Sequence, residues 1–408
     1  MDMELIKIEG GICAPRGFTA SGIHCGIRKN KEKRDLALIY SDSLCSAAAV
    51  YTQNKVKGAP ILVTRKNIAD GLAQAVICNS GNANTCNADG EEKAQMMCDI
   101  IAKELSITPE NVIVASTGVI GQVLPIAPIQ SHAHELAQTL SKEGSADAAE
   151  AILTTDTCRK EIAVSFELGG KECRIAGMAK GSGMIHPNMA TMLCFLTTDV
   201  SIDPDMLKKA LSLCVTDTFN MVSVDGDTST NDMVSIMASG QAGNVMIDGE
   251  GLFFETFTEA LLEVCRHLAK EVAADGEGAS KALICTVQGA PTKDTARKIA
   301  KSVITSSLFK AAMFGSDANW GRVLCAIGYT DANFNIDKTR VTLSSCAGSI
   351  LVCENAAGVE FSEEEAKVIL SQKEITILIE LFDGEEEATA YGCDLTYDYV
   401  KINGDYRT

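Results

Sequence analysis

The feature that most constrains the fold is an alternation of short apolar runs with longer stretches of helical periodicity. Helical spacing of apolar residues recurs at 92–104, 255–274, 294–312 and 362–371, and β-rich runs occupy 75–78, 111–115, 161–166, 283–287 and 375–381. The last helix is expected to begin with a capping box, in which Glu365 reaches back to Ser362. A chain of 408 residues is long enough for two or three packed units. The pattern therefore predicts an α/β fold, with the strand order left open.

The cysteines do not point to a metal site or to disulfides. The chain has 16 cysteines but no C-x-x-C pair, and several lie among apolar neighbours, such as Cys78 and Cys285. Aromatic residues make up only 5%, so the core must be mainly aliphatic. We interpret the cysteines as small buried hydrophobic residues in a reducing compartment and expect no metal.

The charge distribution argues against nucleic acid as a partner. Residues 1–190 carry 19 basic and 21 acidic side chains, whereas residues 191–408 carry 17 and 33, which gives a net charge of −18 for the chain. Such an excess of negative charge repels phosphate backbones. No apolar stretch is long enough for a membrane span, and the start lacks the pattern of a signal peptide. We therefore expect a cytoplasmic protein that binds neither nucleic acid nor membrane.

The stretch Lys180–Leu193 is the most informative for chemistry. A loop rich in glycine ends at Ala190, a small residue, followed by Thr191 and an apolar run. In such a layout the Thr191 hydroxyl can attack the carbonyl of Ala190 and form an ester that water opens. The released α-amino group has an ordinary pKa of about 7.7–8.0 and can act as the base for its own hydroxyl. Taken alone, the pattern also fits a loop that simply enters a strand, and His186 beside it fits a structural role.

Several motifs, in the same order along the chain, resemble the ornithine acetyltransferase (glutamate N-acetyltransferase) family. The resemblance runs from about residue 11 to the last residue. Besides 180–193, the matching segments are 14–18, 54–57, 79–84, 116–121, 225–232, 275–278, 317–322 and 403–408. It implies self-cleavage between Ala190 and Thr191, an N-terminal-nucleophile-like architecture of layered sheets covered by helices, and a smaller C-terminal α/β unit. The expected products are an alpha chain, 1–190, and a beta chain, 191–408.

The resemblance also implies a role for each matching residue. Thr191 is the nucleophile, and Thr117 and Gly118 form the oxyanion hole, where a hydroxyl and a backbone N–H meet the developing negative charge. The substrate-binding positions are Thr154, Lys180, Thr191, Glu277, Asn403 and Thr408. The choice between Thr154 and Thr157 stays open, with Thr154 favoured.

The acidic loop 225–232 has oxygen groups that calcium can use, but it lacks the spacing of an EF-hand. We interpret it as a hydrogen-bonded turn near the site. The C-terminal matches imply that the tail folds into the site, whereas chain ends are usually frayed.

The implied activity is transfer of the acetyl group from N2-acetylornithine to glutamate through an acetyl-Thr191 ester, with no cofactor. Acetyl-CoA is a second acetyl donor in some members of that family. The expected assembly is a heterotetramer of two alpha and two beta chains. Two alternatives remain open: an N-terminal-threonine aminopeptidase or amidase, and an amino-acid-binding protein that never cleaves.

Overall fold

The computed structural model describes residues 4–186 and 192–404, which pack as two compact units. Within these described residues, unit 1 comprises 4–181, 192–219 and 228–268, and unit 2 comprises 182–186, 220–227 and 269–404. Ala190, Thr191 and Thr408 lie outside the described residues. No helix in the described part of the chain is long and apolar enough to cross a bilayer.

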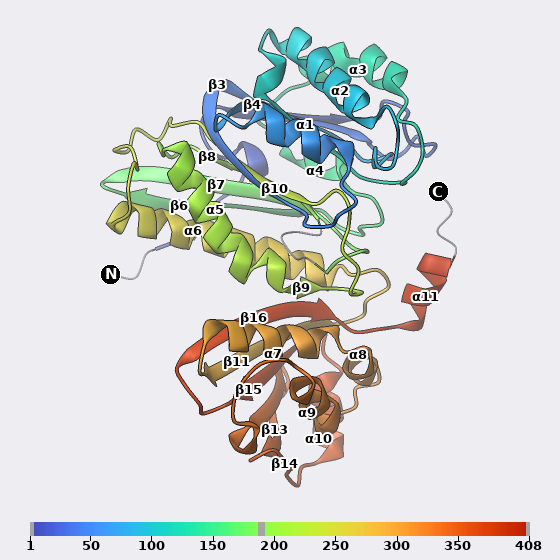
Figure 1. Cartoon of the computed structure of the whole chain (residues 1–408), viewed down its shortest axis with the longest axis vertical. Helices are drawn as coiled ribbons and strands as arrows, with labels where there is room; N and C mark the ends of the chain where they lie inside the picture. The colour runs from blue at the N-terminus through green and yellow to red at the C-terminus, as the bar shows by residue number, and fades with distance from the viewer. Residues whose placement is uncertain (1–3, 187–191, 405–408) are drawn as a thin grey trace. The chain divides into compact units, whose positions relative to one another are not determined.

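Unit 1 is built on a nine-stranded sheet (Figure 1). Its order is β1-β6-β7-β8-β10-β3-β4-β5, with β2 also paired to β3. The strands are β1 (Ile6–Lys7), β2 (Phe18–Ile23), β3 (Leu36–Tyr51), β4 (Leu72–Asn79), β5 (Val112–Ser116), β6 (Lys160–Leu168), β7 (Lys171–Lys180), β8 (Leu193–Thr198) and β10 (Met233–Ala238). The helices are α1 (Ala59–Asn67), α2 (Gly90–Leu105), α3 (Ile126–Gln138), α4 (Ser145–Ala151), α5 (Pro204–Asp217) and most of α6 (Leu252–Ala274), with short 3-10 turns at Gly11–Cys13 and Pro109–Asn111.

The long strand β3 belongs to both halves of this sheet. Its first half pairs with β2 and β4, its pairing to β4 shifts register between Tyr40 and Cys45, and its second half pairs with β10. Alternate residues of β4 and β5 point to opposite faces: Ile77 packs under helices α1–α3, whereas Val76 packs toward the face of β8 and β10. The two halves therefore face each other across an aliphatic core.

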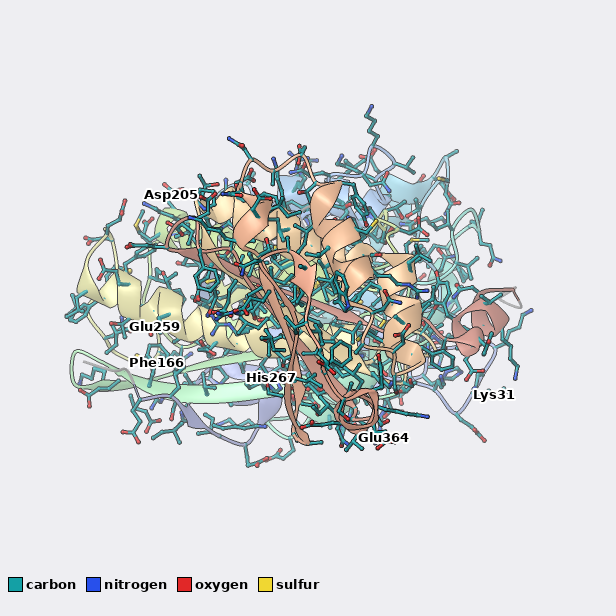
Figure 2. All side chains as sticks on the ribbon, turned by 90° about the horizontal axis from the view of Figure 1, so that it is seen from below. Lys31, Phe166, Asp205, Glu259, His267 and Glu364 are labelled. Atoms are coloured by element: carbon teal, nitrogen blue, oxygen red, sulfur yellow. The ribbon has the colours of Figure 1, made fainter. Side chains whose placement is uncertain are left out.

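Helix α6 covers the outer face of the second half. A Cβ atom on Gly177 of β7 would collide with Leu196 of β8 and with Leu268 of α6, which places the helix directly on these strands. Figure 2 shows helix α6, which carries the label Glu259, alongside strand β6, which carries the label Phe166. Unit 1 thus has the layer order helices, sheet, sheet, helices, which confirms the layered α/β architecture expected from the sequence.

Unit 2 is a smaller α/β unit with its own core. Its sheet has the order β14-β13-β12-β15-β11-β16-β9. The strands are β9 (Val222–Ser223), β11 (Ala282–Ala290), β12 (Arg340–Ser345), β13 (Gly348–Glu354), β14 (Ala357–Gly358), β15 (Glu374–Glu380) and β16 (Glu386–Cys393). The helices are α7 (Lys293–Thr305), α8 (Ser307–Phe314), α9 (Trp320–Gly328), α10 (Glu363–Leu370) and α11 (Tyr397–Gly404), with a 3-10 turn at Ile336–Lys338; another, Phe219–Met221, begins at the end of unit 1.

Most predicted elements are confirmed, and one is wrong. The expected helix over 294–312 is two helices, because Ser306 has an extended backbone and caps α8 by accepting a hydrogen bond from Phe309 N–H. The apolar spacing continues across Ser306, from Val303 and Ile304 to Phe309, so periodicity alone misses the break that the Ser306 hydroxyl makes by bonding to a backbone N–H. In α10 the Ser362 hydroxyl caps Glu365 N–H at 3.2 Å, as the capping-box prediction required of the serine.

Candidate active site

The turn after β5 presents two hydrogen-bond donors. Thr117 and Gly118 follow the buried end of this strand, and both are half-buried. Gly118 has a φ of +129°, and a Cβ atom there would lie 2.7 Å from the carbonyl carbon of Gly81, so only glycine fits. Within the described part of the chain, neither the Thr117 hydroxyl nor the Gly118 N–H has a hydrogen-bond partner. The turn can therefore offer both donors to an oxyanion.

Buried asparagines hold this turn in place. Asn79 donates to the Ser116 hydroxyl at 2.6 Å and accepts N–H bonds from the next loop at its side-chain oxygen. Asn231 donates to the carbonyl oxygens of Ala83 and Ser116, while its own oxygen accepts from two hydroxyls. Fully paired polar groups of this kind rigidify a site. The 229–232 part of the acidic loop is thus the hydrogen-bonded turn that the sequence predicted.

Asp156 is the centre of a buried charge cluster. Its carboxylate accepts from Lys160 Nζ at 2.8 Å and from Gly181 N–H at 2.6 Å, and it lies 3.9 Å from Lys180 Nζ. It also accepts from Thr154 N–H at 2.9 Å. Burial alone would raise the pKa of Asp156, but Lys180 and Lys160 outweigh it and hold that pKa well below the usual range. Asp156 therefore fixes both Thr154 and Lys180, which favours Thr154 over the exposed Thr157 as the binding threonine.

We expect Asp156→Ala to destabilise the fold by about 3–5 kcal/mol, because it leaves two buried ammonium groups without their carboxylate. Since the pKa of Asp156 is lower in the folded chain than in the unfolded one, this contribution is complete above about pH 4 and is lost only as the pH falls through the folded value. Urea unfolding at pH 7 measures the loss. Glu172→Ala, which removes an exposed partner of Arg174, is the control and should change little. Equal losses for the two variants would contradict this account.

The strand ends next to the predicted cleavage point lie side by side. Lys180, the last residue of β7, is the register partner of Leu193, which in turn is the partner of Met233 on β10. Met233 N–H donates to Met192 O at 3.0 Å. Lys180 is 7% exposed, so its charge sits in a sheltered position beside the start of β8.

Glu277 and Asn403 meet within unit 2. Glu277 follows α6 in a tight turn, and its carboxylate accepts from Asn403 Nδ2 at 2.8 Å. Helix α11 packs its backbone against this turn, since a Cβ atom on Gly278 would lie 2.6 Å from Tyr399 N. The end of the chain is therefore a helix as far as Gly404, which a composition-based reading would have left frayed.

The segment Ser182–His186 is also fixed within unit 2. Asp225 accepts N–H bonds from Met184 and Ile185 at 2.7 and 2.9 Å, so its carboxylate serves as a backbone anchor. His186 Nδ1 lies 3.1 Å from Ser223 Oγ, and burial together with Lys301 lowers the pKa of His186 to about 4. The imidazole is therefore neutral at physiological pH and held by a hydroxyl, consistent with the structural role assigned to it.

A model described as the ArgJ family matches residues 19–408. The chain belongs to the ArgJ family. The family named from the sequence motifs is thereby confirmed.

Two relatives align along almost their whole length. "Arginine biosynthesis bifunctional protein ArgJ" of Caldanaerobacter subterraneus subsp. tengcongensis is 48% identical over 98% of this chain and 99% of its own. The protein of the same name from Symbiobacterium thermophilum is 50% identical, with the same coverage.

Among solved structures, the Bacillus halodurans protein named arginine biosynthesis bifunctional protein argJ is 43% identical, with a TM-score of 0.50 over 52% of this chain and 98% of that one. An ornithine acetyltransferase complexed with ornithine, from Mycobacterium tuberculosis, is 32% identical, with a TM-score of 0.42 over 46% of this chain and 100% of that one.

Sequence reasoning missed the buried residues that hold this candidate site together. Asp156 lies inside the motif 154–157 that contains the candidate binding threonines, and its i,i+4 spacing to Lys160 was the available signal. Asn231 lies in the acidic loop 225–232. Its side chain donates to Ala83 and Ser116, which are more than 100 residues away, so no local pattern reveals these contacts.

Proposed function

We propose that this chain is a self-cleaving acetyltransferase of arginine biosynthesis that moves an acetyl group from N2-acetylornithine to glutamate. The observation that carries the proposal is near-complete alignment with relatives named as arginine biosynthesis ArgJ proteins, at 48–50% identity. The two neighbouring donors, the Thr117 hydroxyl and the Gly118 N–H, support the proposal, because acyl transfer needs an oxyanion hole.

The first chemical event is self-cleavage. The Thr191 hydroxyl attacks the Ala190 carbonyl, the peptide C–N bond breaks, and water hydrolyses the resulting ester. This gives chains 1–190 and 191–408 with a free α-amino group on Thr191. The aligned Bacillus halodurans chain corresponds to roughly half of this chain, as one such fragment would.

Transfer then proceeds in two halves. The Thr191 α-amine takes the hydroxyl proton while Oγ bonds to the acetyl carbon, and the carbonyl electrons move onto the oxygen, which Thr117 and Gly118 stabilise. The C–N bond breaks, the ornithine nitrogen takes the proton, and an acetyl ester remains on Thr191. Glutamate attacks this ester through its own amine, and the same steps in reverse order give N-acetylglutamate. No metal or cofactor enters this balance.

The family resemblance assigns the charged groups of each unit to substrate binding. Lys180 suits a carboxylate, and Asp156 fixes its position with Thr154. Glu277 and Asn403 suit an ammonium end, and Thr408 completes the proposed binding set. We also propose acetyl-CoA as a second donor, a cytoplasmic location and a heterotetramer of two alpha and two beta chains.

The test is a pair of measurements on purified protein. Denaturing mass spectrometry should find two chains, and acetylornithine plus glutamate should yield N-acetylglutamate, with acetyl-CoA tried as donor in a second arm. A single chain that binds amino acids without turnover would favour the binding-protein alternative. Release of acetate alone, unaffected by glutamate, would favour the amidase.

The C-terminal contact gives a further expected result. Removing residues 403–408 should raise KM by several-fold to about a thousand-fold, and Asn403→Ala should raise it by about 10- to 150-fold, because each hydrogen bond to a charged group contributes about 1.5–3 kcal/mol. Self-cleavage should continue, and acetate should leak faster without glutamate. Lys401→Ala, an exposed change on the same helix, is the control. Unchanged KM, kcat and acetate release would show that this end has no part in binding.

A further inference from the structure

Arg28 is a half-buried cation that the proposed mechanism does not use. It lies in the loop between β2 and β3. Its guanidinium donates from Nε and Nη2 to Ser80 O at 2.8 and 2.6 Å, and Nη2 also donates to Leu153 O. The donors of a guanidinium lie in one rigid plane, so a guanidinium that holds two carbonyl groups also fixes their relative position.

The carbonyl of Leu153 belongs to the peptide unit that leads into Thr154. The N–H of the same unit donates to the Asp156 carboxylate at 2.9 Å. In a trans peptide the C=O and N–H groups point in opposite directions, so Arg28 and Asp156 hold this unit from its two sides. Because Asp156 also lies 3.9 Å from Lys180 Nζ, the position of this unit relative to Lys180 is fixed as well.

The carbonyl of Ser80 belongs to the peptide unit that leads into Gly81. The Gly81 N–H donates to the side-chain oxygen of Asn79 at 3.3 Å, so this unit too is held at both its oxygen and its nitrogen. A Cβ atom on Gly118 would lie 2.7 Å from the carbonyl carbon of Gly81. Gly81 therefore packs directly against the oxyanion turn, and a shift of this unit would move the surface on which Gly118 rests.

The loop that carries Arg28 is itself anchored. The fully buried carboxylate of Asp35 accepts from the backbone N–H groups of Cys25 and Arg28 at 2.6 and 2.8 Å, and Ser80 N–H donates to Asp35 O at 3.0 Å. A second contact joins the same two segments, because Ser80 Oγ donates to Ala151 O at 2.5 Å. Loss of the Arg28 side chain should therefore leave the fold intact while it releases the two peptide units.

We propose that Arg28 is a positioning residue for acetyl transfer: it sets the position of Thr154 relative to the oxyanion turn at Thr117 and Gly118. This inference rests on the proposed function, in which Thr154 binds the substrate whose carbonyl oxygen the turn must receive. A displacement of about 1 Å between such groups can cost about 100-fold in rate. Arg28 acts through two backbone carbonyl groups and transfers no proton.

The test measures kcat and KM for acetylornithine on cleaved, purified wild type, Arg28→Ala, Arg28→Lys and Arg34→Ala. Arg34→Ala is the matched control, since it removes an arginine of the same loop that pairs with the exposed Asp147 and Glu150. Arg28→Ala should lower kcat by about 10- to 100-fold and raise KM several-fold, because both peptide units are released. Arg28→Lys should fall between Arg28→Ala and the wild type, because an ammonium keeps the charge but lacks the planar fork. Arg34→Ala should behave like the wild type.

A second measurement separates positioning from general stability. Guanidinium chloride at low concentration should raise the kcat of Arg28→Ala, whereas sodium chloride at the same concentration should not, because only the guanidinium ion can replace the missing donors. Neither salt should raise the kcat of Arg34→Ala. Thermal unfolding of each variant shows that the assays are made on folded protein.

Three outcomes would overturn the inference. The first is an Arg28→Ala protein with the kinetic constants of Arg34→Ala, even if its melting temperature is lower. The second is a loss of activity that Arg28→Lys shares in full and that guanidinium leaves unchanged. If Arg28→Ala fails to fold or to cleave, Arg28→Gln is compared with Arg34→Gln, and equal kinetic constants are the third. Failure of the proposed function is distinct from all three, because the wild type itself would then transfer no acetyl group.

Discussion

Thr191→Ala is expected to remain a single chain of 43.3 kDa and to transfer no acetyl group. The variant lacks the hydroxyl that attacks the Ala190 carbonyl, and it also lacks the oxygen that would carry the acetyl group. Both losses should be complete, because alanine at position 191 leaves no side-chain hydroxyl on the residue after the scissile bond. Denaturing mass spectrometry and an assay with acetylornithine and glutamate measure the two losses separately.

Thr191→Ser is the matched control. It keeps the hydroxyl and changes only a methyl group, so it should cleave and retain transfer at a reduced rate. A wild-type preparation that is fully active as one uncut chain would remove the basis of the mechanism. An active Thr191→Ala protein would do the same.

The second large effect is expected at the turn after β5. Thr117→Ala should lower kcat by about 100- to 1,000-fold and change KM little, because the hydroxyl acts on charge that develops only in the transition state. The backbone N–H of Gly118 remains, so the variant should retain measurable activity. Steady-state kinetics on cleaved protein gives both constants.

Ile120→Ala controls for general disturbance of the same turn, since its side chain is 40% exposed and carries no donor. It should behave like the wild type. If Thr117→Ala instead raises KM at constant kcat, then Thr117 is a binding residue and the assignment of the oxyanion hole is wrong. Self-cleavage can use other donors, so it is not a readout for Thr117.

The sequence was informative where the physics is local. Apolar spacing over 92–104 and 255–274 predicted α2 and α6, because an amphipathic helix repeats its buried face every three to four residues. The β-rich runs at 75–78 and 111–115 predicted β4 and β5, because a short run of apolar and β-branched residues is typical of a buried strand. The motif match predicted Thr117, Gly118 and Lys180 as site residues, and the chemistry of each side chain or N–H group suggested its role.

What the sequence left open depends on distant contacts. The pairing of β3 with β10 joins residues about 180 apart, and the side-chain bond from Asn231 reaches Ser116 across 115 residues. The role of Asp156 follows from its burial beside Lys180, which only the assembled sheet creates. Cleavage at Ala190–Thr191 and binding by Thr408 stay predictions, because these residues lie outside the described part of the chain.

The pairing of β7 with β8 has a consequence for the two fragments that a cut between them would leave. Strand β7 would end one fragment and β8 would begin the other, yet six residue pairs join them, from Ile175–Thr198 to Lys180–Leu193. Strand β10 of the second fragment is likewise paired with β3 of the first. Both fragments would therefore contribute strands to one sheet, and they would co-purify under native conditions. Each fragment on its own would expose the middle of a sheet, so the chain has to fold before it is cut. Fragments produced in separate preparations and then mixed should therefore fail to assemble.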